Sequence, residues 1–184
     1  MRKKLLGAEH PDTLTSMGNL ASIYRDQGKF NEAEQLQVQV LNMMKKLLGA
    51  EHPDTLTSMG NLARSYHDQK KFVKAEQLEV QVMNMRKKLL GVEHPITLLS
   101  MGNLASIYSD QRKFYEAEQL EVQVLDMMKK LLGAEHPYTL TSMGNLARSY
   151  HDQGKFDKAE PLEATWCRTS KNSLKHGKFS KDIL

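Results

Sequence analysis

The chain has 184 residues, of which 40% are hydrophobic and 26% are charged, and its formal net charge is +4. No apolar run approaches the roughly 20 residues that a membrane-spanning helix needs. The basic start at residues 1–4 is followed by too few apolar residues for a secretory signal. The single cysteine, Cys167, cannot form an internal disulfide, and no Cys or His cluster has zinc spacing. We therefore expect a cytoplasmic protein without a membrane segment, a metal or another cofactor.

The positive charge is concentrated near the C-terminus. Residues 166–184 contain five lysine and arginine residues and one acidic residue, so the rest of the chain is neutral overall. Binding to phosphate groups requires a concentrated basic surface. Nucleic acid is therefore disfavoured as a partner.

The sequence repeats with a period of 42 residues. Each repeat contains the pair His-Pro, whose histidines are His10, His52, His94 and His136. A period of roughly 20 to 50 residues is typical of stacked repeat proteins. We expect the core to be a row of similar interfaces. Because each histidine precedes a proline at a helix start, we interpret the four histidines as capping residues and not as metal ligands.

Each repeat predicts two helices joined by a short turn, which we name the A helix and the B helix. In the first repeat, Pro11 suits a first helical turn, and Asp12 and Thr13 can satisfy its free N–H groups. Gly28 breaks the pattern between the helices, and Gly49 ends the B helix. Apolar residues at helical spacing are Leu14, Met17, Leu20, Ala21 and Tyr24 in the A helix, and Phe30, Ala33, Leu36, Val40, Met44 and Leu47 in the B helix.

The array occupies residues 1–165, with repeats at about 12–53, 54–95, 96–137 and 138–165. Residues 1–11 match the end of a B helix and its loop, so we expect the chain to be a fragment of a longer array. Pro161 is expected to interrupt the fourth B helix. Residues 166–184 lose the repeat pattern and are predicted to form a basic, mobile tail.

The repeat resembles a known family. Its specific motifs are Leu20-Ala21, Tyr24, residues 27–30 (Gln-Gly-Lys-Phe) and residues 32–34 (Glu-Ala-Glu), and they recur in all four repeats in lightly edited form. These motifs are similar to the tetratricopeptide repeat, and residues 47–54 (Leu-Leu-Gly-Ala-Glu-His-Pro-Asp) resemble the 42-residue kinesin light chain type. The resemblance implies an all-α, right-handed superhelical solenoid of stacked antiparallel helical hairpins. It also implies a concave groove, lined by the A helices, that binds peptides or protein segments without catalysis.

The chain departs from this family at two B-helix positions. The first usually carries an aromatic residue, and here it is occupied by Gln37, Glu79, Glu121 and Glu163. The second usually carries alanine, and here it is occupied by Val40, Val82, Val124 and Trp166. The first change removes a large packing group, and the second adds bulk nearby.

Polar residues follow one side of each A helix. In the first repeat this polar stripe consists of Thr15, Asn19, Ser22 and Asp26, opposite the apolar positions. The asparagine recurs as Asn19, Asn61, Asn103 and Asn145. An amide offers donors and an acceptor to the backbone of a bound peptide. We expect this ladder to face the groove, and the alternative is a solvated helix face.

The stripe alternates between repeats. Arg64 and Arg148 stand where the first and third repeats have serine, and His67 and His151 follow one helical turn later. Arginine binds carboxylates in a bidentate way, so these residues, together with Arg25, are candidates for selecting an acidic ligand. The alternative is that the two arginines pair with aspartates of the same groove, at Asp68 and Asp152.

Each A helix also contains a glycine, which costs up to about 1 kcal/mol relative to alanine. These glycines are Gly18, Gly60, Gly102 and Gly144. Close approach of a neighbouring helix would explain them, and we favour this over approach of a ligand backbone.

No nucleophile elbow, phosphate loop, catalytic carboxylate pair or zinc signature is present, so we expect no enzymatic activity. We expect a scaffold or adaptor that binds a protein or peptide segment. The alternative is a structural or regulatory sensor array within a larger signalling protein, such as a nucleotide-driven switch. The near-identity of the repeats favours that alternative, because a groove tuned to one peptide generally needs different side chains along its length.

Overall fold

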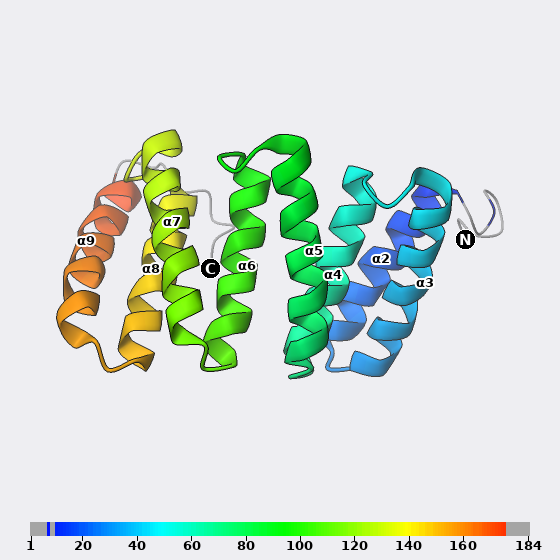
Figure 1. Cartoon of the computed structure of the whole chain (residues 1–184), viewed down its shortest axis with the longest axis horizontal. Coiled ribbons are helices and arrows are strands. Elements are labelled where there is room, and N and C mark those ends of the chain that lie inside the picture. Colours follow the sequence, from blue (N-terminus) through cyan, green and yellow to red (C-terminus); the bar gives the residue numbers. More distant parts are fainter. Residues whose placement is uncertain (1–6, 8–9, 176–184) are drawn as a thin grey trace. The chain divides into compact units, whose positions relative to one another are not determined.

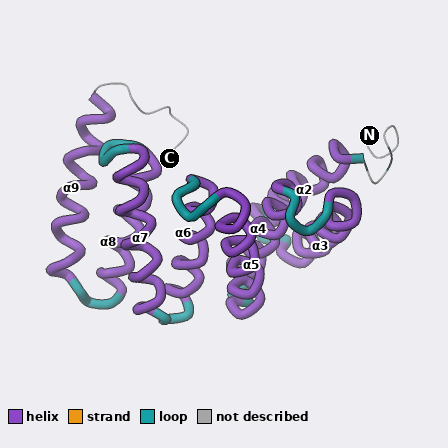
Figure 2. Tube along the Cα trace, turned by 45° about the horizontal axis from the view of Figure 1, so that its top comes forward, coloured by secondary structure: helices purple, strands orange, loops and turns teal. Residues whose placement is uncertain are grey.

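The computed structural model describes residue 7 and residues 10–175. These residues form eight α-helices and no strand, arranged as helical hairpins (Figures 1 and 2). The A helices are α2 (Pro11–Asp26), α4 (Pro53–Asp68), α6 (Pro95–Asp110) and α8 (Pro137–Asp152). The B helices are α3 (Phe30–Leu48), α5 (Phe72–Leu90), α7 (Phe114–Leu132) and α9 (Phe156–Lys175). The predicted all-α fold of repeated hairpins is confirmed.

Every A helix begins with the same histidine cap. The Nδ1 atom of His10 accepts a hydrogen bond from the backbone N–H of Asp12 at 3.2 Å, and the other three histidines make the equivalent bond at the same distance. Proline follows each cap at the first helical position, where its missing N–H costs nothing. The predicted capping role of the histidines is confirmed.

The turns between A and B helices need a residue in the left-handed conformation. Gly28 and Gly154 supply it with φ of 75° and 71°. Lys70 and Arg112 adopt φ of 58° and 60° at the same repeat position, although they carry a Cβ. The turn is therefore set by the hairpin as a whole and tolerates some backbone strain.

The chain divides into two compact units, which are described separately. Unit 1 is Met1–Leu89 and contains α2 to α5, and unit 2 is Leu90–Leu184 and contains α6 to α9. In unit 1, α3, α4 and α5 share a core of Leu41, Leu56, Met59, Leu62 and Val82. In unit 2, α7, α8 and α9 share a core of Leu125, Met143, Leu146, Tyr150 and Ala159.

Two of the apolar residues at helical spacing are exposed. Leu20 and Leu47 are 40% and 42% exposed, so the expectation that the apolar side of the first A helix faces the core is wrong at Leu20, and Leu47 lies outside the core as well. Leu62 and Leu146, the counterparts of Leu20 in later repeats, are only 4% and 3% exposed. In those repeats the preceding B helix packs on the A helix, and α2 is the first A helix of unit 1.

Helix α9 also differs from its prediction. It continues through Pro161 to Lys175, so the expected interruption was wrong and the predicted tail boundary at 165–166 falls inside a helix. A proline removes one backbone hydrogen bond, and just beyond it the hydroxyl of Thr165 donates to the Pro161 carbonyl at 2.8 Å. Residues 176–184, and the predicted helix end within residues 1–6, lie outside the described residues.

Candidate peptide-binding surface

The polar stripe lies at the surface of both units. Asn19 and Asn61 are exposed in unit 1, and Asn103 and Asn145 are half-buried in unit 2. The leucine that follows Asn61 is buried, so the helix separates a core side from a polar side within one turn. The asparagine ladder remains a candidate contact for a ligand within each unit.

Neighbouring A helices meet near their C-terminal ends. In unit 1, Arg25 Nε lies 3.5 Å from a carboxylate oxygen of Asp68, and Arg25 Nη2 donates to Asp26 at 2.9 Å. In unit 2, the hydroxyls of Ser109 and Ser149 lie 3.3 Å apart. Arg25 therefore joins α2 to α4, and its charge is already paired with two aspartates.

The two arginines of the stripe differ in their partners. Arg148 Nη2 donates to Asn145 Oδ1 at 2.7 Å, which leaves its other guanidinium nitrogens for a ligand. Arg64 is exposed and makes no hydrogen bond or ion pair with any described residue. Within that same part of the chain, neither arginine pairs with the aspartate four residues later. The guanidinium groups thus remain candidates for contacting an acidic ligand.

The two candidate histidines lie against the start of their own B helices. The ring centroid of His67 is 5.7 Å from that of Phe72, and the ring centroid of His151 is 5.0 Å from that of Phe156. These contacts place the imidazoles at the turn between the helices. We therefore give the histidines a smaller part in ligand contact than the asparagines and arginines.

The A-helix glycines are not required by packing, and the packing explanation was wrong. Among the described residues outside its own helix, no atom would lie within 4 Å of a Cβ added at Gly18 or Gly102. At Gly60 and Gly144 the nearest atoms would be Glu79 Oε2 at 4.0 Å and Trp166 Nε1 at 3.9 Å, which are ordinary contact distances. The alternative that a ligand backbone approaches these glycines remains open.

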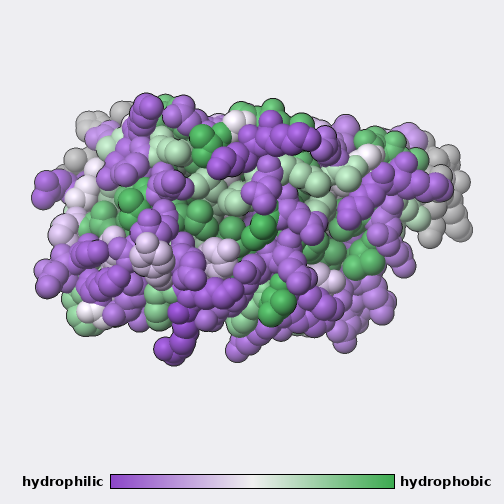
Figure 3. Space-filling view, in the orientation of Figure 1, coloured by the Kyte–Doolittle hydropathy of each residue, from purple (hydrophilic) through white to green (hydrophobic). Residues whose placement is uncertain are grey.

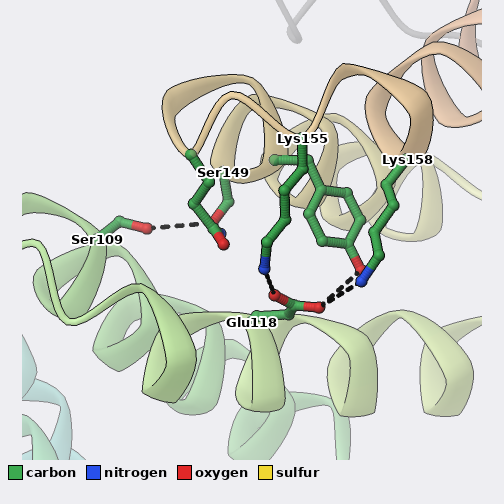
Figure 4. Close-up of polar contacts among 7 residues, drawn as sticks. Ser109, Glu118, Ser149, Lys155 and Lys158 are labelled. Carbon is green, nitrogen blue, oxygen red and sulfur yellow. Dashed lines mark hydrogen bonds and ion pairs between the residues drawn. The ribbon is translucent and has the colours of Figure 1, made fainter.

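The structure shows a polar contact between neighbouring repeats that the analysis of sequence motifs did not reveal. Lys155 Nζ and Lys158 Nζ donate to Glu118 at 2.6 and 3.1 Å, and the Tyr150 hydroxyl lies 3.3 Å from the same carboxylate (Figure 4). In unit 1, Lys71 Nζ donates to Glu34 at 2.7 Å. The recurrence of glutamate and lysine at a fixed separation was the signal for this contact.

The charge of these lysines alters the acidity of the two glutamates. The hydrogen bond from Lys155 lowers the pKa of Glu118, and this effect outweighs burial of the carboxyl, which raises it. Burial also raises the pKa of Glu34, but the hydrogen bond and charge of Lys71 more than offset it, so this pKa is lowered as well. Both carboxylates are thus held ionised between a B helix and the next A–B turn.

The rest of the described surface has an open hollow and scattered apolar side chains. A hollow of about 590 Å³ beside the A–B turns of unit 1 is open to solvent and is lined by residues 28–32 and 68–70. Among the described residues, no group of three or more His, Cys, Asp or Glu side chains could hold a metal ion. None of the described helices is long and apolar enough to cross a membrane. On the face shown in Figure 3, apolar side chains are scattered among hydrophilic ones.

A sequence model of a known protein family matches most of the chain. The model described as tetratricopeptide repeat matches residues 1–46, 12–88 and 97–164. The chain belongs to the tetratricopeptide repeat family. Repeats of this family are protein-interaction scaffolds, and the hairpins and recurring motifs described above are its structural basis. The right-handed superhelix concerns the whole array and stays a prediction.

Solved tetratricopeptide repeat structures share this fold. A kinesin light chain-like protein of Podosopora anserina with nearly identical repeats is 35% identical, with a TM-score of 0.77 over 94% of this chain and 82% of that chain. A single-residue variant of it is 34% identical, with a TM-score of 0.81 over 95% and 82%. BtubC from P. vanneervenii is 20% identical, with a TM-score of 0.75 over 95% of this chain and 69% of that chain, and it shows the fold alone. No curated protein matched the chain.

Proposed function

We propose that the protein is a non-catalytic scaffold that holds a segment of a partner protein against the polar stripes of its A helices. The observation that carries this proposal is the exposure of Asn61 and Arg64 beside fully buried core positions of the same helix. Neither side chain has a partner among the described residues. Their hydrogen-bonding groups are therefore available without a cost to the fold.

The glycines support a close approach of the ligand. Gly18 lies three residues after Thr15 and four before Ser22, so it is on the same side of α2 as the stripe. No atom of the described residues outside α2 lies within 4 Å of the position that a Cβ would take there. A ligand backbone can come nearer to a helix that lacks this atom, which offsets the intrinsic cost of glycine.

The arginines would give the surface a preference among ligands. A ligand carboxylate near Arg64 or Arg148 could accept hydrogen bonds from two guanidinium nitrogens. Asp68 and Asp152 lie one turn beyond these arginines and would repel a second acidic group. We therefore propose that the partner segment carries an isolated acidic side chain. The cytoplasmic location of the protein stays a prediction.

The experiment is selection from a random peptide library on the intact chain, followed by titration of the selected peptides. Replacing Asn61 and Asn103 with alanine should weaken the binding of all selected peptides alike. The binding free energy should fall by on the order of 1 kcal/mol for each lost hydrogen bond. Replacing Arg64 and Arg148 with serine should remove the preference for acidic peptides and reduce the salt dependence of binding.

Serine is a matched replacement because the chain already carries Ser22 and Ser106 at the equivalent positions. A control variant with alanine at Gln35 and Gln119, which are exposed on B helices, should bind as the wild type does. Peptides that bound the wild type and both stripe variants equally would contradict the proposal. That result would favour a structural or regulatory array, which is also suggested by the near-identity of the repeats.

A further inference from the structure

The first turns of the A helices differ in chemistry between the two units. In unit 2, α6 exposes Ile96 and Leu99, whose exposed fractions are 45% and 54%, and α8 exposes Tyr138, whose exposed fraction is 61%. In unit 1, Asp12 and Asp54 occupy the repeat positions of Ile96 and Tyr138 on α2 and α4, and both are exposed. Unit 2 therefore presents apolar side chains where unit 1 presents carboxylates.

These first-turn positions continue the polar stripe. On α8, Tyr138, Thr141, Asn145 and Arg148 follow one another at spacings of three, four and three residues, so they share one side of the helix. The same spacing holds on the other A helices, because the repeats align without gaps. Helices α6 and α8 run in the same direction, since α7 returns the chain between them (Figure 1). Both apolar starts thus lie at the same end of unit 2.

The carboxylates of unit 1 are not neutralised by the neighbouring histidine caps. His52 Nδ1 lies 3.8 Å from Asp54 Oδ2, but it already accepts the hydrogen bond from the backbone N–H of Asp54. A ring nitrogen that accepts a hydrogen bond carries no proton to share with a carboxylate. His10 and Asp12 repeat this arrangement, with 3.9 Å between the two atoms. Both aspartates can therefore attract a cationic side chain of a ligand.

The apolar residues of unit 2 are not explained by the start of the helix. An acidic residue in the first turn stabilises a helix through its dipole, and neither α6 nor α8 has one. The histidine caps of both helices are still made, at 3.2 Å. The Tyr138 ring contacts the ring of His136 at 5.4 Å between centroids, yet most of Tyr138 remains exposed. We therefore attribute the apolar side chains to contact with a bound segment.

We propose that the two units select different segments of partner proteins, an inference that rests on the proposed function. Unit 2 binds a segment with a large apolar side chain near its acidic one, and unit 1 binds a segment with a basic side chain instead. Tyr138 and Arg148 are ten residues apart on α8, which is about 15 Å along the helix axis. Asp54 and Arg64 have the same separation on α4. An extended segment spans this distance in roughly four or five residues.

The experiment is selection from the random peptide library on two variants of the intact chain. Arg64→Ser removes the acidic contact of unit 1, so the selected peptides should carry an apolar side chain roughly four or five residues from an acidic one. Arg148→Ser removes that contact in unit 2, and its peptides should carry a basic side chain in place of the apolar one. Added salt should weaken the second set more, because these peptides make charge contacts at both ends.

Exchanging the first-turn residues tests the assignment. In the Arg64→Ser chain, Tyr138→Asp places the residue of unit 1 on α8. It should weaken the apolar peptides about tenfold or more, because they lose the burial of a large apolar side chain. In the Arg148→Ser chain, Asp54→Tyr is the reciprocal exchange, and it should weaken the basic peptides and allow apolar ones to bind.

The matched control in the Arg64→Ser chain is Tyr115→Asp. Tyr115 is 72% exposed on α7, and Asp157 already stands at this position in the fourth repeat. The control should leave peptide binding unchanged, and circular dichroism should show unchanged helicity for all variants.

Two selections that returned the same motif would overturn the inference and leave the proposed function standing. Apolar peptides that bound equally well after Tyr138→Asp would do the same, as would an equal weakening by Tyr115→Asp. A library that yielded no peptide for the wild type would contradict the proposed function, and this inference with it.

Discussion

The α3–α4 junction of unit 1 and the α7–α8 junction of unit 2 have the same architecture but bury different polar groups. The first buries Gln37, and the second buries Glu121, which is 7% exposed. Ser65 and Ser149 occupy the same place on the facing A helices and are also buried. Two junctions with nearly identical sequences can therefore form the same apolar packing and still differ in how their stability depends on pH.

The two junctions satisfy their polar atoms to different extents. In unit 1, both side-chain polar atoms of Gln37 and the hydroxyl of Ser65 are buried and have no hydrogen-bond partner among the described residues. In unit 2, Glu121 Oε2 is similarly unpaired, but Ser149 contacts Ser109 at 3.3 Å and Gln153 at 3.4 Å. A buried polar group without a partner lowers stability. The α3–α4 junction is therefore destabilised mainly by unmade hydrogen bonds, and the α7–α8 junction mainly by the burial of a carboxyl group that can ionise.

Burial raises the pKa of Glu121 from 4.5 to about 7, although a hydrogen bond from Ser149 and the charge of Arg148 oppose this shift. Glu118 on its own helix and Asp152 on α8 raise the pKa further. Because the folded pKa is higher than the unfolded one, the folded state holds its proton more tightly. The resulting stability is complete below the unfolded pKa and is lost as the pH rises through about 7.

The largest expected effect tests what the two junctions share. Leu41→Ala and Leu125→Ala should each destabilise the chain by about 2 to 5 kcal/mol, because each leaves a cavity between a B helix and the next A helix. The measurement is urea unfolding at pH 5, where Glu121 is protonated. Similar losses would show that the apolar packing is equivalent, and a large difference would mean that the junctions differ in more than charge.

The next effect tests how they differ. The wild type should lose up to about 3 kcal/mol of unfolding free energy between pH 5 and pH 8 because Glu121 ionises. Glu121→Gln, which places the glutamine of unit 1 at this position, should abolish that loss. Hydrogen exchange of α7 and α8 amides at several pH values measures it. In the wild type these amides should lose protection relative to α3 and α4 as the pH rises. Equal pH dependence of both junctions in the wild type would contradict the role of Glu121.

The reciprocal variant is the control for this prediction. Gln37→Glu should give the α3–α4 junction the pH dependence that Glu121 gives to α7–α8. The facing serine is already present at both places, so the exchange changes little besides the titrating group. If Gln37→Glu produced no pH dependence, the surroundings of Glu121 and not its burial would be responsible.

A smaller effect concerns the glutamates that bind lysine across the repeats. Glu118 accepts hydrogen bonds from two lysines, whereas one lysine is found on Glu34. Glu118→Gln should cost about 1 kcal/mol and Glu34→Gln somewhat less, since the lysines are partly exposed and screened by solvent. Both pKa values are lowered, so this stability is present above the unfolded pKa and is lost as the pH falls. The measurement is urea unfolding of the wild type and both variants at pH 7 and pH 3. If each substitution lowered the free energy of unfolding equally at both pH values, the ion pairs would contribute nothing to stability.

Most of the helix limits could be predicted from the sequence because their causes are local. A histidine cap, a proline at the first turn and a glycine after the last turn lie within a few residues of each boundary. Arg25 and Asp68 are far apart in the sequence, so periodicity could not reveal their ion pair. The exposure of Leu20 could not be predicted either, because the same residue type is buried wherever a B helix covers it.

The buried position of Glu121 had a signal that was only partly interpreted. The family resemblance marked this position as usually aromatic, which indicates an interior site, but the glutamate was treated as a lost packing group. A carboxyl at an interior position predicts a raised pKa by desolvation alone. Partial hydrogen bonding by Ser149 required the fold, since that serine lies on the next A helix.

The smallest expected effect separates backbone strain from junction packing. Lys70 in unit 1 and Arg112 in unit 2 hold φ near 60°, where Gly28 and Gly154 stand in the other turns. A residue with a Cβ costs roughly 1 kcal/mol in this conformation, while glycine gains freedom in the unfolded chain. Lys70→Gly and Arg112→Gly should therefore each stabilise the chain by at most about 1 kcal/mol, and Gly28→Lys and Gly154→Lys should destabilise it by a similar amount. Thermal unfolding of the four variants at pH 5 and at pH 8 measures these changes. Because none of the variants alters Gln37 or Glu121, the change in stability should be the same at both pH values. A stabilisation that appeared in one unit and not in the other would mean that the turns, and not only the buried Gln37 and Glu121, distinguish the two units.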